Sequence, residues 1–231
     1  MKSMMNVFSV LLFFSCLGLI SCIDKSKVTP TDDTAYFPLK AGFSSEFDLQ
    51  RTIYSRSDLP EIRNYTIRQL IADSFKDLQN HWVYKIEYAA GTGQENWKTD
   101  SIIPIWRTTD NLLVQENGQT VLRQVYPISE GASWNGNCYN SLGEVKFRFT
   151  RVGLPFQSGS QLFPKTITVI RQDDSTLLSR NRYIEIYAEH VGLIRTEKSV
   201  LQYCSTPDCR GKGMISSGWK EISVIKNFGK I

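Results

Sequence analysis

The chain has 231 residues, and its 27 lysines and arginines against 23 aspartates and glutamates give a net charge of +4 at pH 7. The basic residues are scattered along the chain, so the charge pattern argues against a nucleic-acid partner. Five cysteines and two histidines leave few ligands for a metal ion.

The N-terminus has a short charged start and then an apolar run from Val7 to Ile20. A membrane-spanning helix needs about 20 apolar residues, so this shorter run predicts a signal peptide over residues 1–21. The rival interpretations are an uncleaved anchor and a plain secretory signal. Leu19–Cys22 reads Leu-Ile-Ser-Cys, which has the form of a lipobox.

Cleavage of a lipobox leaves a cysteine whose thiol carries a diacylglycerol, so we predict lipidation of Cys22 with acyl chains such as palmitate. Two or three acyl chains anchor a protein stably to a membrane. Residues 22–35 are polar and predict a lipidated flexible tether, followed by one folded domain over residues 36–231. We expect the outer membrane of the cell envelope, facing either the periplasm or the surface.

Strand signals dominate the chain after the tether, since aromatic and β-branched residues alternate with polar ones. Strands are predicted over residues 45–54, 64–73, 81–89, 97–108, 146–152, 166–171, 177–187, 193–203 and 219–227. Asn117-Gly118 between two apolar runs predicts a hairpin. The Pro- and Gly-containing residues 152–164 predict a long loop, and residues 172–175 a second hairpin turn.

No long segment keeps the 3.6-residue period of a helix. About ten short strands separated by polar turns therefore predict an all-β fold, in which a single antiparallel sheet curls into a barrel-like or sandwich form.

Cys204 and Cys209 flank a turn-forming stretch, and in an oxidising compartment they predict a disulfide. A metal site is the rival interpretation, but zinc sites usually need four protein ligands and no second pair lies nearby. Cys138 is left over. It is expected to be a small buried residue or, alternatively, to pair with another chain.

Three segments occur in order along the domain: YFPLKAG at Tyr36–Gly42, WNGNCYN at Trp134–Asn140, and HVGLIRTE at His190–Glu197. Together they resemble a group of secreted lipoproteins from Bacteroidetes-type bacteria, whose domains carry YFPL..G, W-G-N and VGL...E segments. That group has no known activity, so the resemblance implies lipid anchoring, an antiparallel β fold and a non-enzymatic role, with no catalytic residues.

The middle segment also suggests a low-ranked ligand site, in which the ring of Trp134 and the amides of Asn135 and Asn137 hold a carbohydrate or another polar ligand. The alternative is structural: asparagines form tight turns, and a buried indole anchors them. We favour the structural alternative.

No catalytic, metal or cofactor motif is present in the sequence. His81 and His190 are interpreted as hydrogen-bonded structural residues. We therefore expect no enzyme and no cofactor, but a binding or structural module that is held in the membrane through Cys22. A carrier of an apolar ligand and a hydrolase with an unrecognised site are the alternatives. The expected partners are an envelope protein or an apolar or glycan ligand.

Overall fold

The computed structural model describes residues 32–91 and 97–231, and Asp32–Ile231 form one compact unit. Its elements are η1 (Asp33–Tyr36), β1 (Phe43–Tyr54), β2 (Glu61–Lys76), β3 (Trp82–Gly91), β4 (Lys98–Arg107), β5 (Asn111–Glu116), β6 (Gln119–Val125), β7 (Ser133–Asn135), β8 (Lys146–Ser158), β9 (Gln161–Ser175), β10 (Ser179–Ala188), β11 (Gly192–Tyr203) and β12 (Ile215–Lys230).

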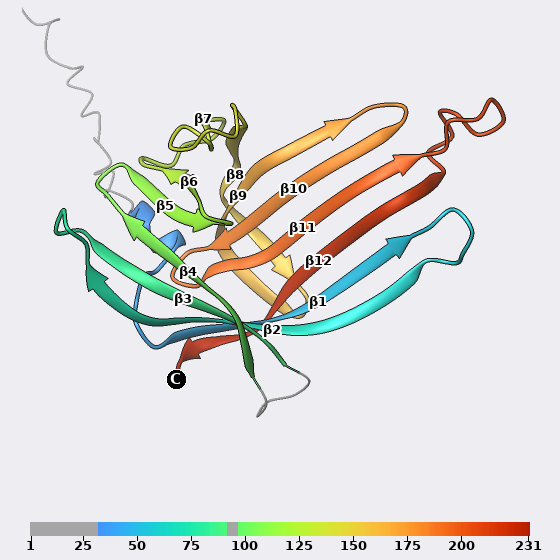
Figure 1. Cartoon of the computed structure of the whole chain (residues 1–231). Helices are drawn as coiled ribbons and strands as arrows, with labels where there is room; N and C mark the ends of the chain where they lie inside the picture. The colour runs from blue at the N-terminus through green and yellow to red at the C-terminus, as the bar shows by residue number, and fades with distance from the viewer. Residues whose placement is uncertain (1–31, 92–96) are drawn as a thin grey trace, which may run out of the picture. The chain divides into compact units, whose positions relative to one another are not determined.

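All twelve strands belong to one antiparallel sheet in the order β6-β5-β4-β3-β2-β1-β12-β11-β10-β9-β8-β7. Two six-stranded meanders are joined where β1 pairs with β12, from Phe43↔Lys230 to Tyr54↔Gly218. The sheet curls until it is nearly closed into a barrel (Figure 1). The predicted all-β, single-sheet, barrel-like fold is therefore confirmed.

The two ends of the sheet meet where β6 approaches β7. The backbone N–H of Leu122 donates to the carbonyl of Gly136 at 2.8 Å, and the indole N–H of Trp134 donates to the carbonyl of Leu122 at 2.8 Å. Trp134 also packs against Phe149, with ring centroids 4.5 Å apart. These contacts connect the two ends of the sheet at this point.

The main core lies inside this closed part of the sheet. It contains buried residues from both meanders, namely Tyr36, Phe37, Ile71, Ile86, Ile105, Leu112, Leu113, Val114, Val121, Leu122, Trp134, Phe147, Phe149, Ile167, Val169 and Tyr187. Tyr36 and Phe37 enter it from η1, whose Asp32 cap accepts the N–H of Thr34. Residues 33–35 therefore belong to the folded unit, although the tether was expected to extend through them.

The strand register confirms the hairpin predicted at Asn117-Gly118 and shows how β4 accommodates a proline. Asn117 and Gly118 have φ of 48° and 75° and form the tight turn between Glu116 and Gln119. Positive φ angles at two hairpin residues match a type I′ turn. Pro104 lies within β4, where β3 pairs beside it but β5 pairs only with Ile105–Arg107. Pro104 therefore lies in a part of β4 that has a paired strand on one side only, where a proline is tolerated.

Two loop predictions are wrong. Residues 152–164 are a hairpin, in which Ser158 of β8 pairs with Gln161 of β9. Pro155 fits because the register shifts between Leu154 and Phe156, where the ladder is interrupted. Residues 172–175 continue β9, and the turn comes later, where Thr176 Oγ1 accepts the backbone N–H of Leu178 and of Ser179.

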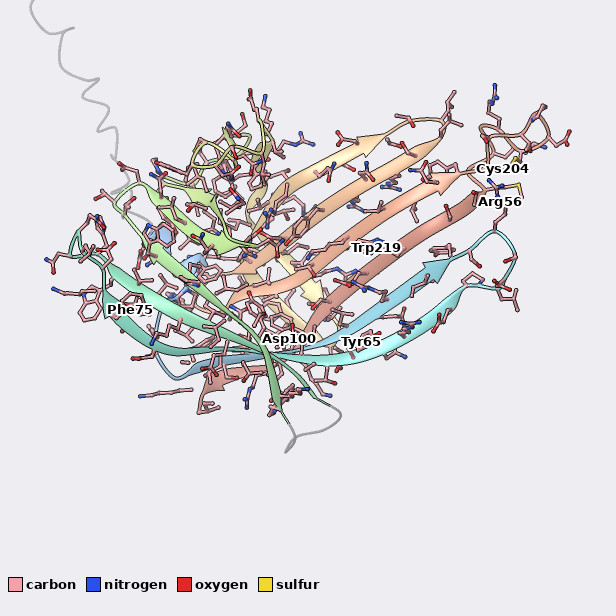
Figure 2. All side chains as sticks on the ribbon, in the orientation of Figure 1. Arg56, Tyr65, Phe75, Asp100, Cys204 and Trp219 are labelled. Atoms are coloured by element: carbon pink, nitrogen blue, oxygen red, sulfur yellow. A yellow bond between two sulfur atoms is a disulfide. The ribbon has the colours of Figure 1, made fainter. Side chains whose placement is uncertain are left out.

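The open end of the sheet carries the β1–β2, β9–β10 and β11–β12 connections. Figure 2 shows Arg56 and Cys204 together at this end, whereas Phe75 lies at the opposite end of β2. The inner face between these two ends carries the charged residues described next.

Candidate functional site

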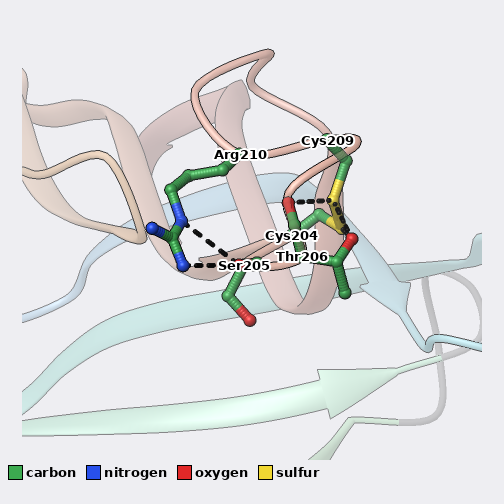
Figure 3. The surroundings of a disulfide bond; sticks show 5 residues. All are labelled: Cys204, Ser205, Thr206, Cys209 and Arg210. Atoms are coloured by element: carbon green, nitrogen blue, oxygen red, sulfur yellow. Dashed lines mark hydrogen bonds between the residues drawn. A yellow bond between two sulfur atoms is a disulfide. The ribbon is translucent and has the colours of Figure 1, made fainter.

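The predicted disulfide between Cys204 and Cys209 is present in the β11–β12 connection, with Cα atoms 5.7 Å apart (Figure 3). The loop has further internal contacts. Thr206 Oγ1 lies 2.9 Å from the Sγ of Cys209, and Arg210 Nη2 donates to the carbonyl of Ser205 at 3.0 Å. The disulfide therefore fixes a compact loop at the open end of the sheet.

The other cysteines are differently placed. Cys138 is free and exposed, so the expectation that it is buried is wrong. It lies in the turn after β7, where its backbone N–H donates to the carbonyl of Asn135. Cys22 and the signal peptide over residues 1–21 lie outside the described residues, so their lipidation stays a prediction.

At the low-ranked ligand site of Trp134, Asn135 and Asn137, the side chains already make hydrogen bonds to other parts of the protein. Asn135 Oδ1 accepts the N–H of Asn137 and of Val145, and Asn137 Nδ2 donates to the carbonyl of Gly143. The indole of Trp134 is buried between β6 and β7, where the two ends of the sheet meet. These contacts favour the structural interpretation, and the ligand site stays a prediction.

The two histidines lie apart from each other. His81 Nδ1 lies 3.2 Å from Asp77 Oδ2 in the β2–β3 turn. The backbone N–H of His190 donates to the carbonyl of Ala35 at 2.7 Å. Within residues 32–91 and 97–231, no group of three or more histidine, cysteine or acidic side chains is placed to hold a metal ion.

The sequence analysis missed a cluster of buried charged residues on the inner face of the sheet. Strand alternation places Tyr183, Glu185 and Tyr187 of β10 on this face. Glu116 ends β5 beside the Asn117-Gly118 turn, and Arg123 follows on β6. The register between β9 and β10 shifts at Arg171, so this residue is a bulge. We call these six residues the charged cluster: Glu116, Arg123, Arg171, Tyr183, Glu185 and Tyr187.

Glu185 is the centre of the charged cluster and is fully buried. Its carboxylate accepts from Arg123 Nη2 at 2.7 Å and from Arg171 Nη1 at 3.1 Å. The hydroxyls of Tyr183 and Tyr187 donate to it at 2.7 and 2.6 Å. Four donors thus converge on one carboxylate, which leaves it well satisfied.

Glu116 completes the charge balance of the cluster. Its carboxylate lies 2.7 Å from Arg171 Nη2 and 3.2 Å from Arg123 Nη1. Two carboxylates therefore face two guanidinium groups.

Burial by itself would raise the pKa of Glu185, but Arg123, Arg171 and the tyrosine hydroxyls together lower it to about 2. Burial opposes the charge of Glu116 in the same way, and the two arginines still hold the pKa of Glu116 below its usual range. A general acid or base works best with a pKa near the working pH. The two carboxylates are thus poor proton donors, and the cluster has the chemistry of a structural ion network.

A half-open cavity of about 470 Å³ lies beside the charged cluster. Residues from both sides of the curled sheet line it, namely Phe47, Leu49, Ile67, Gln69, Tyr88, Ala89, Ala90, Asp100, Ser101, Ile103, Glu116, Asn117, Arg123, Tyr183, Leu193, Thr196, Lys198, Glu221 and Ser223. Its size falls within the ~300–1,000 Å³ of small-molecule sites. We refer to it as the inner cavity.

The sequence predicted only a small part of the lining of the inner cavity. The predicted strand over residues 81–89 alternates, so one of its faces should carry Trp82, Ile86 and Tyr88. Tyr88 lines the inner cavity and Ile86 is buried in the core, whereas Trp82 is 52% exposed at the end of β3. The one sign of the charged cluster in the sequence is Tyr183–Tyr187 (YIEIY), where alternation puts an acid between two tyrosines on one face of a strand.

Comparisons with known proteins give distant structural likenesses only. No protein-family model matches the chain, and no curated protein matches its sequence. A candidate exported protein with a YmcC-like fold from Bacteroides fragilis superimposes with a TM-score of 0.46 and 11% identity, over 84% of this chain and 98% of that one. A candidate lipoprotein from Parabacteroides distasonis gives a TM-score of 0.41 and 9% identity over the same shares.

Likenesses this distant identify neither a family nor a function for this chain. Among residues 32–91 and 97–231, there is no helix whose length and apolar character would let it cross a membrane.

Proposed function

We propose that the chain is an exported lipoprotein of the cell envelope, anchored at Cys22 in the outer membrane, whose β domain is a non-catalytic binding module. The observation that carries the binding role is the inner cavity, a half-open hollow of about 470 Å³ that residues from both meanders line. It combines apolar side chains with charged and hydroxyl groups, as small-molecule sites do.

The charged cluster supports binding in preference to catalysis. Arginine side chains hold both of its carboxylates in the ionised state, and each hydroxyl near Glu185 donates a hydrogen bond to it. Such a network is rigid, and rigid polar groups beside an apolar wall are typical of ligand pockets. The hydrolase alternative would need a proton donor that this cluster does not supply.

Native mass spectrometry of the full-length protein, extracted from membranes in detergent, tests the binding role. A reproducible extra mass that denaturation removes is the expected result. A bare mass, together with no response to added ligands, would overturn the binding role.

Two variants locate the ligand. Ala90→Trp places a large ring on an exposed lining residue of the inner cavity and is expected to abolish the extra mass. Thr99→Trp puts the same ring on an exposed position of the neighbouring strand β4 that does not line the cavity, and it should leave the extra mass unchanged. Equal retention in both variants would exclude the inner cavity as the site.

A further inference from the structure

Among the described residues that line the inner cavity, Lys198 is the one lysine. It lies on β11, where its register neighbours are Tyr183 of β10 and Glu221 of β12. Its Nζ lies 4.4 Å from the centroid of the Tyr183 ring, within the range of a cation–π contact. The ammonium group is thereby held against the wall of the cavity.

The carboxylates near Lys198 are already paired with arginines. Glu221 binds Arg51, with Oε2 2.6 Å from Nη2, and Glu185 binds the arginines of the charged cluster. Within the described part of the chain, no carboxylate oxygen lies within 4.0 Å of the Nζ of Lys198. Lys198 is therefore a cation in a partly buried cavity without a carboxylate counter-ion.

The partly buried position of Lys198 changes the pKa of its ammonium group. Burial lowers its pKa, and this effect outweighs the opposite pull of Glu185 and Glu221. A partly desolvated ammonium gains most from a bound anion, because charge-assisted hydrogen bonds are about twice as strong as neutral ones.

Apolar side chains from the other meander also line the inner cavity. Phe47 and Leu49 come from β1, Ile67 from β2 and Ile103 from β4. Asp100, which lines the cavity from β4 (Figure 2), is an anion on the side remote from β11 in the sheet order. An anionic group is thus repelled at β4 and attracted at β11, while an apolar body fits between them.

We propose that the inner cavity binds an amphipathic anion, a carboxylate or phosphate carried on an apolar chain, with the anionic group on Lys198. This inference rests on the proposed binding function and specifies its ligand class. The carboxylate and phosphate forms share the same chemistry at Lys198, and the test includes both.

The test uses the whole mature chain, residues 22–231, with Cys22→Ser so that no acyl chain of the protein competes for the cavity. Isothermal titration below the micellar range compares decanoate, decyl phosphate, 1-decanol and decyltrimethylammonium. We expect one or both anions to bind at least about tenfold more tightly than the alcohol, and the cation to bind weakest. Preference for one anion over the other then distinguishes a carboxylate ligand from a phosphate ligand.

Charge variants test the role of Lys198. Lys198→Gln should weaken anion binding by about tenfold or more, whereas Lys198→Arg should retain most of it. Lys220→Gln is the matched control, because Lys220 is exposed on β12 and does not line the inner cavity. Thr196→Glu adds a negative charge to the cavity wall and should weaken decanoate binding but not decyltrimethylammonium binding.

The two levels of the proposal fail differently. Equal affinities for anion and alcohol, unchanged by Lys198→Gln, would overturn the anionic ligand class and leave binding in the cavity intact. If the protein binds none of the four probes but still carries the extra mass in native mass spectrometry, the ligand class is again overturned and the binding function stands. If the protein neither binds a probe nor carries an extra mass, the binding function itself is overturned.

Discussion

The carboxylate of Glu185 lies 2.7 Å from the Nη2 of Arg123, although the two residues are 62 positions apart in the chain. Both side chains are buried, Glu185 completely. The pair connects β10 to β6, so the charged cluster links the two meanders inside the closed part of the sheet. Loss of this link should therefore lower the free energy of unfolding of the domain.

Glu185→Gln should destabilise the domain by about 3–5 kcal/mol, because removing one partner of a buried ion network leaves Arg123 and Arg171 without a full counter-charge. Urea unfolding followed by circular dichroism measures the loss. Glu197→Gln is the matched control, since Glu197 pairs with Arg182 and Arg195 at partly exposed positions and should cost less than about 1 kcal/mol. Equal losses in the two variants would contradict a central role of Glu185.

Acid should weaken the fold through the same residue. The pKa of Glu185 is about 2 in the folded state against a usual 4.5, so its contribution is fully present above pH 4.5. As the pH falls from 4.5 toward 2, the unfolded chain takes up the proton first and the contribution is lost. The free energy of unfolding should therefore fall steeply across this window. A Glu185→Gln variant whose pH dependence equals that of the unmodified protein would contradict this assignment.

The sequence predicts the strands and the fold class because their signals are local. Asn117-Gly118 determines a hairpin by backbone preference alone, and Cys204 and Cys209 are only five residues apart. The charged cluster could not be predicted in this way. In Tyr183–Tyr187, the isoleucines predict an inward face and Glu185 an outward one. The structure buries both faces, because Phe163 and other residues of a second apolar cluster cover the isoleucines.

Gly136 should be required for closure of the sheet. A Cβ at this position would overlap the ring of Phe147, which is itself packed against Trp134. Gly136→Ala is expected to cost about 1–3 kcal/mol, as overpacking of a dense core does. Thermal and urea unfolding measure the loss. The double variant Gly136→Ala with Phe147→Leu should lose less than the sum of the two single changes, because leucine vacates the space. Strict additivity would show that the ring of Phe147 is not the obstacle.

Reduction of the Cys204–Cys209 disulfide should lower stability by at most about 2 kcal/mol, since the bond closes a very short loop. The double variant Cys204→Ser with Cys209→Ser should reproduce this loss without reductant. Cys138→Ser serves as the control, because Cys138 is exposed and free, and its change should stay within about 0.5 kcal/mol. Unfolding curves that reductant leaves unchanged would contradict a stabilising disulfide.

Cys22→Ser should release the protein into the soluble fraction, because it removes the thiol that we propose to carry the diacylglycerol. One acyl chain gives only marginal membrane binding, whereas two or more anchor a protein stably, so the change in partition should be nearly complete. Fractionation of cells and mass spectrometry of the N-terminal peptide measure it. Cys138→Ser keeps Cys22 and should remain in the membrane with the acylated peptide. If the Cys22→Ser protein stays in the membrane fraction, the anchor is not the lipid. The apolar run from Val7 to Ile20 would then have to act as an uncleaved anchor.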